Sequence, residues 1–183
     1  MMINELKKII GKKVKRLFLI VWPPFGESDV SQIDISAGYV FEDSTNELFK
    51  ISTDKNELTA PIVEYLPIPN KNFKWIEFDR RMKGWMDCEE GMEMDIEYYE
   101  VSDVNLFKNI VNQKVLDVEL IGITNDSPLG VKLIFDNDFI LSTPISDGNT
   151  IETNLFNKNE NLENFSSLGR IEYISLKNVG KNG

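Results

Sequence analysis

The chain has 183 residues, of which 42% are apolar and 10% aromatic, and its 20 basic and 30 acidic side chains give a formal charge of −10. This composition supplies enough large side chains for a hydrophobic core, while the negative charge disfavours nucleic acid and anionic membranes as partners. Histidine is absent and Cys88 is the single cysteine, which excludes a Ser-His-Asp triad, a His-ligated metal and an intramolecular disulfide. We therefore expect a protein without enzymatic activity, metal or cofactor.

No run of apolar residues approaches the roughly 20 that a membrane-spanning helix needs, and residues 1–16 lack the pattern of a secretory signal. These features predict a soluble, cytoplasmic protein that does not bind membranes. The acidic surface has two interpretations: it keeps the protein soluble, or it faces a basic partner.

The first predicted elements are an amphipathic helix over residues 3–10 and a strand over residues 14–19. The same succession is predicted for residues 104–111 and 115–120. Aligned without a gap, residues 3–20 and 104–121 share seven identities, where composition alone gives about one. The chain is therefore predicted to contain an internal duplication. The identical pairs are Asn4/Asn105, Lys7/Lys108, Ile9/Ile110, Lys13/Lys114, Val14/Val115, Leu19/Leu120 and Ile20/Ile121.

The next predicted elements are two β-hairpins, at residues 39–53 and 132–143. Each has strand-like apolar residues on both sides of a turn rich in Asp and Asn, "DSTNE" in one and "DND" in the other. Phe41 aligns with Phe135 and Thr53 with Thr143, with extra residues in two loops of the first copy. Surface loops accept such insertions readily.

A closing strand is predicted at residues 74–79 and again at 169–174, because both contain Ile-Glu-aromatic within an alternating pattern. We therefore expect an α+β fold with mainly antiparallel sheet, built from two tandem helix-strand-hairpin-strand units, 1–79 and 104–176, with approximate two-fold symmetry. Units of this size are marginal alone, so we expect them to pack together as one globule. Residues 80–103 form a unique connecting segment, and residues 177–183 a disordered tail.

The candidate site is this acidic and aromatic segment. Carboxylates at such density could hold Ca²⁺ or act as an acid/base pair, but the spacing matches no calcium loop. The alternation of Met92, Met94 and Ile96 with acidic residues predicts a strand with one acidic and one apolar face. Aromatic anchors beside carboxylates are typical of a surface that selects a basic protein. The predicted partner-binding residues are Trp85, Asp87, Glu89, Glu90, Glu93, Asp95, Tyr98 and Tyr99.

Each feature of this segment also has a simpler interpretation, since the aromatic side chains could pack in the core and the acids could merely face solvent. In its small size, acidity and lack of catalytic motifs, the chain resembles immunity proteins of bacterial toxin systems, and that resemblance implies an inhibitor of a basic toxin. One alternative is a ligand-binding or weakly catalytic carboxylate site in the seam between the units. The other is a structural subunit of an assembly.

Overall fold

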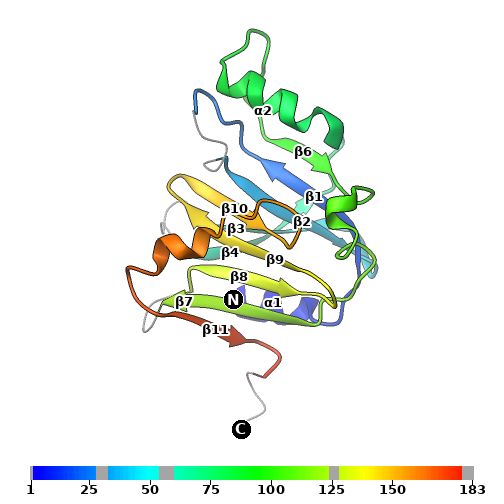
Figure 1. Cartoon of the computed structure of the whole chain (residues 1–183). Coiled ribbons are helices and arrows are strands. Elements are labelled where there is room, and N and C mark those ends of the chain that lie inside the picture. Colours follow the sequence, from blue (N-terminus) through cyan, green and yellow to red (C-terminus); the bar gives the residue numbers. More distant parts are fainter. Residues whose placement is uncertain (1, 28–32, 54–59, 124–127, 179–183) are drawn as a thin grey trace.

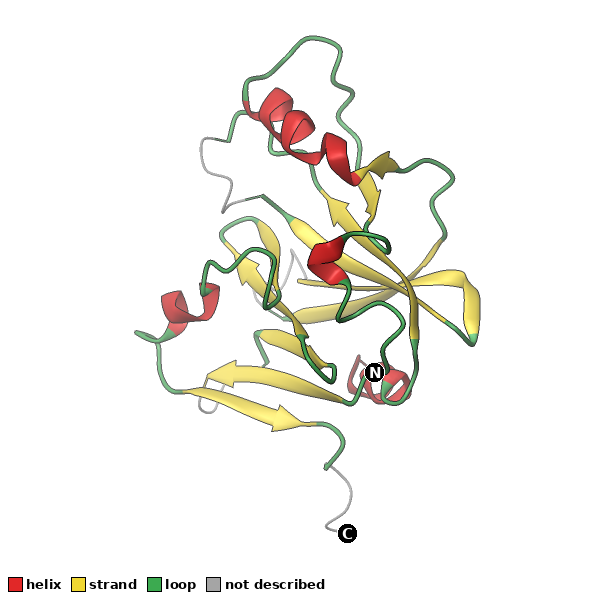
Figure 2. Cartoon of the chain, turned by 45° about the vertical axis from the view of Figure 1, so that its right-hand side comes forward, coloured by secondary structure: helices red, strands yellow, loops and turns green. Residues whose placement is uncertain are grey.

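The structure, a computed structural model, describes residues 2–27, 33–53, 60–123 and 128–178. It contains two mainly antiparallel β-sheets that pack against each other, with two short α-helices at their margins (Figures 1 and 2). The expected α+β class, dominated by antiparallel sheet, is confirmed. Among the described residues, no helix is long and apolar enough to span a bilayer.

The first sheet has the strand order β4-β3-β2-β1-β6-β5, and its neighbours are antiparallel except for β5 and β6, which are parallel. Helix α1 lies beside β4, where the Tyr65 hydroxyl donates to Glu5 at 2.6 Å. Helix α2 packs on β6 at the other end of the sheet (Figure 1). The elements of this half are α1 (Met2–Ile9), β1 (Val14–Val21), β2 (Ile35–Phe41), β3 (Ser44–Thr53), β4 (Pro61–Pro67), β5 (Phe73–Lys74), the 3-10 helix η2 (Trp75–Glu77), α2 (Phe78–Met86) and β6 (Glu97–Glu100).

The second sheet has the order β10-β9-β8-β7-β11, and all its neighbouring strands are antiparallel. Two 3-10 helices replace the α-helices of the first half. The elements are η3 (Asn105–Phe107), β7 (Asp117–Ile123), β8 (Gly130–Ile134), β9 (Phe139–Ile145), β10 (Gly148–Glu152), η4 (Asn161–Phe165) and β11 (Ile171–Ser175).

The two sheets follow the same pattern of strand pairing. The order β4-β3-β2-β1-β6 of the first corresponds to β10-β9-β8-β7-β11 in the second. The register agrees with the sequence alignment for three strands: Leu19 pairs with Tyr99 and Leu120 with Ile174, and Leu19 pairs with Ala37 and Leu120 with Val131. The next strand differs by one residue, because Ala37 pairs with Ile51 and Val131 with Ser142. This register matches Ser52, rather than Thr53 as the sequence predicted, to Thr143.

The segments that precede β1 and β7 bond to each other reciprocally. Lys13 and Lys114, two of the residues that align in the sequence, face each other in an antiparallel bridge. Gly11 and Asn112, which also align, both adopt left-handed backbone with φ of 86° and 64°, a conformation that glycine and asparagine tolerate. Each bond has a counterpart in which the two segments exchange roles. The four bonds run from Val14 N to Gln113 O (3.0 Å), Val115 N to Lys12 O (2.9 Å), Gly11 N to Val115 O (2.7 Å) and Asn112 N to Val14 O (2.8 Å).

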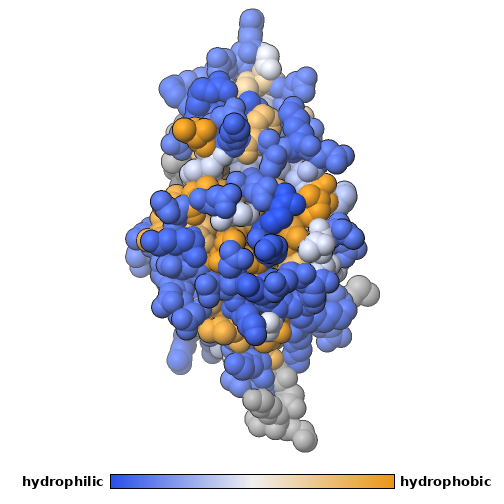
Figure 3. All heavy atoms as spheres, turned by 90° about the vertical axis from the view of Figure 1, so that its right-hand side faces the viewer, coloured by the Kyte–Doolittle hydropathy of each residue, from blue (hydrophilic) through white to orange (hydrophobic). Residues whose placement is uncertain are grey.

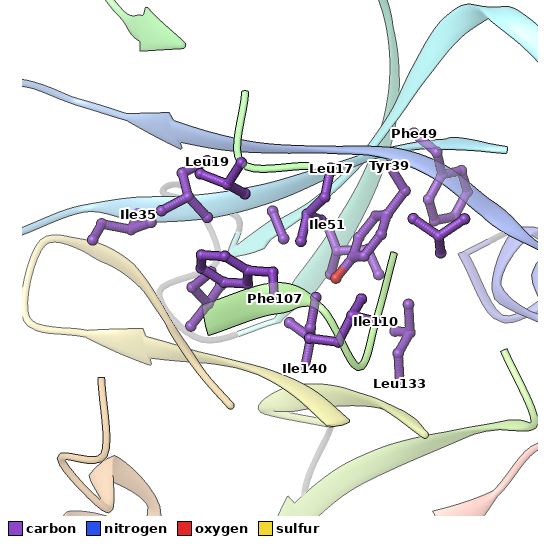
Figure 4. Close-up of a cluster of buried hydrophobic side chains, with 14 of the residues drawn as sticks. Leu17, Leu19, Ile35, Tyr39, Phe49, Ile51, Phe107, Ile110, Leu133 and Ile140 are labelled. Atoms are coloured by element: carbon purple, nitrogen blue, oxygen red, sulfur yellow. The ribbon is translucent and has the colours of Figure 1, made fainter. Parts of the chain in front are cut away.

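One hydrophobic cluster fills the space between the sheets (Figure 4). Leu17 and Tyr39 enter it from the first sheet, and Leu133 and Ile140 enter it from the second. Phe107, from η3, lies between them and is fully buried. Alternation along β1 sends the intervening side chains to the outer face of the first sheet, where a smaller cluster forms. Its buried members are Phe18, Ile20, Val40 and Leu48.

The helix predicted at residues 3–10 is confirmed as α1, but its predicted counterpart at 104–111 is only the short η3 followed by turns. The amide of Phe107 bonds to Val104 O and that of Ile110 to Phe107 O, so the turns here are tighter than those of an α-helix. The buried positions are nevertheless the same, since Phe107 and Ile110 align with Leu6 and Ile9 of α1 and all four enter the core.

The strand predicted at residues 74–79 is wrong, because only Phe73–Lys74 is extended and α2 begins at Phe78. From there Phe78, Met82 and Trp85 recur at helical spacing and are buried on one side. The strand predicted from Met92 to Glu97 is also wrong, since residues 91–96 form a loop.

The strand that completes the pattern of the first sheet is β6, which lies inside the segment 80–103 that we expected to be unique. Its residues Ile96-Glu97-Tyr98 correspond to Ile171-Glu172-Tyr173 of β11 in sequence and in register. The tail predicted to be disordered begins at residue 177, and residues 179–183 lie outside the described residues.

Candidate functional site

Helix α2 and the loop that follows it carry the predicted partner-binding residues. The apolar side of α2 packs on β6, where the Phe78 ring lies edge-on to Tyr99 at 5.1 Å between centroids. The helix ends at Met86, and the turn after it contains Cys88 with φ of 54° and Gly91 with φ of 87°. These left-handed residues turn the chain back towards β6.

A buried carboxylate fixes both ends of this loop. Glu97 accepts hydrogen bonds from Trp85 Nε1 at 2.9 Å, from Arg81 Nε at 2.9 Å and from the Tyr99 hydroxyl. The Arg81 guanidinium also lies over the Phe73 ring, 3.8 Å from its centroid. Burial alone would raise the pKa of Glu97, but the bonds from Arg81, Tyr99 and Trp85 outweigh it and leave that pKa below its ordinary value.

This arrangement places two of the predicted anchors in the core. Trp85 is 1% exposed and Tyr99 is fully buried, so neither reaches a surface that a partner could contact. The sequence suggested exposed anchors because both residues stand beside carboxylates; the helical spacing of Trp85 with Phe78 and Met82 was the signal for burial. Tyr98 is half-buried against the outer cluster of the first sheet, and burial raises its pKa.

The five predicted acids do lie together on the exposed loop, at Asp87, Glu89, Glu90, Glu93 and Asp95. Asp87 forms an ion pair with Lys83 one helical turn earlier. The loop also exposes Met94 and Ile96, which are 59% and 38% exposed. These two apolar residues, rather than Trp85 and Tyr99, accompany the acids on the surface.

A hollow of about 430 Å³ opens beside this loop. Glu93 and Asp95 line one side, and the rings of Phe73 and Tyr98 line another. Arg81 and Lys71 also line it, so the hollow presents both signs of charge. Both cations lie over the Phe73 ring, so the chain itself occupies the position that a cation from a partner would take on that ring.

A second hollow, of about 600 Å³, lies between α2 and the segment that follows β10. Met82 and Met86 contribute from α2, and Ile33, Ile35 and Phe156 from the other side. The pocket is largely apolar and stands at one end of the seam between the sheets. The middle of that seam is occupied by the hydrophobic cluster of Figure 4.

Asn149 holds the two sheets together at the same seam, a role that sequence reasoning missed. Its side-chain oxygen accepts from Thr53 and Ser142 at 2.9 Å each, and its amide donates to Ile35 O at 2.8 Å. The side chain is buried, and its hydrogen-bonding groups are paired across both sheets. Only tertiary structure brings these partners together, so the sequence carried no local signal.

Within the described residues, no group of three or more Cys, Asp or Glu side chains is arranged to hold a metal ion. Comparison of the chain with protein-family models, curated proteins and solved structures finds no match. The face seen in Figure 3 is mostly hydrophilic, with apolar side chains in scattered patches.

Proposed function

We propose that the chain consists of two tandem units related by approximate two-fold symmetry and that it acts by binding a basic protein rather than by catalysis. The tandem arrangement is supported by the common register of the two sheets and by the reciprocal bonds around Lys13 and Lys114. Isologous contacts of this kind pair a segment with its own counterpart.

The observation that supports binding is the exposed loop from Asp87 to Ile96, which is held at both ends by buried residues. Trp85 precedes it and Glu97 follows it, and the two are bonded to each other. Because the ends are fixed, the carboxylates and the apolar residues Met94 and Ile96 are presented without a large loss of conformational freedom on binding. A cationic partner would be attracted by the acids and contact the apolar residues at close range.

Within this class, the function we favour is inhibition of a basic bacterial toxin, in the manner of an immunity protein. A net charge of −10 speeds the encounter of this protein with a positively charged cleft. Once bound, the negative charge repels nucleic acid from that cleft. The protein would act in the cytoplasm, where the toxin must be neutralised, and would need no cofactor.

The test uses the toxin domain encoded by the gene that adjoins this one. We expect the full chain to inhibit it, and Glu89→Lys, Glu90→Lys and Glu93→Lys combined to slow association and to weaken its dependence on salt. A matched control reverses three exposed acids of the second unit, Asp136, Asp147 and Glu163. Both triple variants change the net charge equally, and each should alter stability by less than about 0.5 kcal/mol per site.

Equal slowing by the two triple variants would show that only net charge matters and would remove the loop as the binding surface. A neighbouring gene that encodes no toxin, or a toxin that the chain does not inhibit, would contradict the immunity function. Loss of folding in the first variant alone would assign the acids a structural role.

A second candidate is a ligand site in the seam. The apolar hollow beside Met82 and Met86 is the observation in its favour. Against it, the middle of the seam is packed with side chains. The two carboxylates that line the hollow, Asp79 and Asp87, are exposed, and Asp87 is paired with Lys83, so they do not form a buried acid and base pair. We therefore favour protein binding over a ligand site in the seam.

A further inference from the structure

The outer edge of β11 is left uncovered in the described part of the chain. β7 pairs with one side of β11, and neither strand nor helix pairs with the other (Figures 1 and 2). The other edges are blocked: β4 begins and ends with Pro61 and Pro67, β5 has two residues, and β10 lies against β2 through Asn149. An unprotected edge is a template for pairing with another chain.

The same chain shows what fits on such an edge, because the counterpart of β11 in the first sheet is covered. β5 runs parallel to β6, with Phe73 opposite Tyr99 and Lys74 opposite Glu100. Helix α2 then packs over the inner face of β6. As a result Tyr99 is fully buried, whereas its counterpart Ile174 is 49% exposed.

The backbone of β11 presents the groups that this kind of pairing needs. The Leu176 amide donates to Val118 O at 2.8 Å, which directs alternate amides of the strand towards β7. The amides and carbonyls of Tyr173 and Ser175 therefore point to the free edge. The residues at the corresponding positions of β6 direct their amides and carbonyls towards β5.

We propose that the free edge of β11 binds an extended segment of another protein, which adds to the second sheet as a parallel strand. By analogy with Phe73–Lys74, the segment places an aromatic side chain opposite Ile174 and a basic one opposite Ser175, and continues into a helix. Strand addition of this kind takes affinity from main-chain bonds and specificity from alternate side chains. The proposal rests on the proposed correspondence of the two units, but not on the proposed partner of the acidic loop, because the two surfaces are separate.

The probe is a labelled synthetic peptide with the sequence of residues 71–87, which contains the segment that covers β6. Fluorescence anisotropy with the full chain should give a dissociation constant of about 10–100 µM. Ser175→Pro removes one outward amide without removing a bond to β7 and should weaken binding at least about tenfold. Ser175→Ala is the matched control, since both variants lose the bond from the Ser175 hydroxyl to Asp117 and only the proline loses the amide.

A second pair of variants, Ile174→Lys and Ile174→Val, tests the apolar contact without altering the backbone. We expect the lysine to abolish binding of the basic peptide and the valine to preserve it. Thermal unfolding of each variant shows whether the fold is retained; if Ser175→Pro does not fold, the Ile174 pair decides the result.

Three outcomes would overturn the proposal. The first is absence of binding at roughly millimolar peptide, and the second is binding that neither Ser175→Pro nor Ile174→Lys weakens. The third is binding that disappears in the triple variant of Glu89, Glu90 and Glu93 alone, because the basic peptide would then sit on the acidic loop. The proposal would likewise be overturned if sedimentation experiments show a dimer that Ser175→Pro dissociates. The edge of β11 would then bind a second copy of this chain rather than another protein.

Discussion

The strands β6 and β11 hold the same place in their sheets but have different surroundings. Around β6, the preceding residues 73–86 supply Phe73, Phe78 and Trp85, and Glu97 of β6 itself accepts bonds from three side chains. The half that contains β11 depends instead on buried amides, since Asn149 and Asn161 bond to side chains and carbonyls of neighbouring strands. The same order of strands can therefore be stabilised by buried aromatic side chains or by buried amides, and the strand register does not determine which of the two is used.

The largest effect is expected when the two halves are separated. The core contains side chains from both sheets, and Phe107 of the second half lies between them. A fragment of residues 103–176 should lose cooperative unfolding, because it would expose one side of this cluster to water. Circular dichroism during heating would measure this. A fragment as stable as the full chain would show that the halves are independent.

The residues that pack on the covered strand β6 should be far more sensitive to truncation than those of the open strand β11. Trp85→Ala creates a cavity and leaves Glu97 with one donor fewer, and we expect it to lower the free energy of unfolding by about 3–5 kcal/mol. Ile174→Ala, at the corresponding surface of β11, should cost about 0.5 kcal/mol or less because that side chain is half exposed. Chemical denaturation gives both values, and similar losses would refute the contrast between the strands.

Two of the buried carboxylates, Glu97 and Glu152, should respond to pH with opposite signs. The pKa of Glu97 is lowered, so its contribution is present above the ordinary value of 4.5 and disappears as the pH falls through the lower value of the folded state. Burial and the nearby charge of Glu160 raise the pKa of Glu152, against the amide bonds from Asn161 and Asn159. The cost of its charge is therefore absent below 4.5, grows as the pH rises from there to the raised value, and is complete above it.

Glutamine substitutions separate these two effects. Glu97→Gln should destabilise the fold at neutral pH by about 1–3 kcal/mol and remove part of the loss of stability in acid. Glu152→Gln keeps an acceptor for the Asn161 amide and should stabilise the fold at neutral pH by about 1 kcal/mol or less. Unfolding curves between pH 3 and pH 7 would measure both, and shifts of the same sign would contradict the assignment.

The smallest expected effect concerns Tyr39, whose hydroxyl has no hydrogen-bond partner among the described residues although it is buried between the sheets. Burial raises its pKa. Tyr39→Phe should leave stability unchanged or increase it by about 1 kcal/mol, because an unpaired buried hydroxyl is removed. A loss of stability in denaturation would reveal a partner for this group.

The sequence predicted most of the sheet and little of the site, for physical reasons. Alternation and turn residues indicated the hairpins, and the identities between residues 3–20 and 104–121 aligned β1 with β7. The closing strand of the first half was misplaced because "KWIEFD" and "IEYYEV" both contain Ile-Glu-aromatic, as "RIEYIS" does. The identical Ile-Glu-Tyr of the second and the helical spacing that begins at Phe78 distinguish them.

The acidic residues were correctly expected to be exposed, since carboxylates without partners avoid the core. The burial of Trp85 had a local signal in its helical spacing with Phe78 and Met82. Its bond to Glu97, twelve residues away, and the bond of Asn149 to Ile35 in the other half had none, because such pairs leave no periodic signal in the chain. The exposed edge of β11 could not be predicted from the sequence either, because a strand lies at an edge only when no other strand pairs with that side in the folded sheet.

The reciprocal bonds around Lys13 and Lys114 have a consequence for assembly. At this junction each segment offers the donors and acceptors that the other returns, which is the local geometry by which two identical subunits associate. Two separate subunits joined in this way would dissociate on dilution, whereas here the connecting chain sets their effective concentration. The contact is therefore independent of how much protein is present.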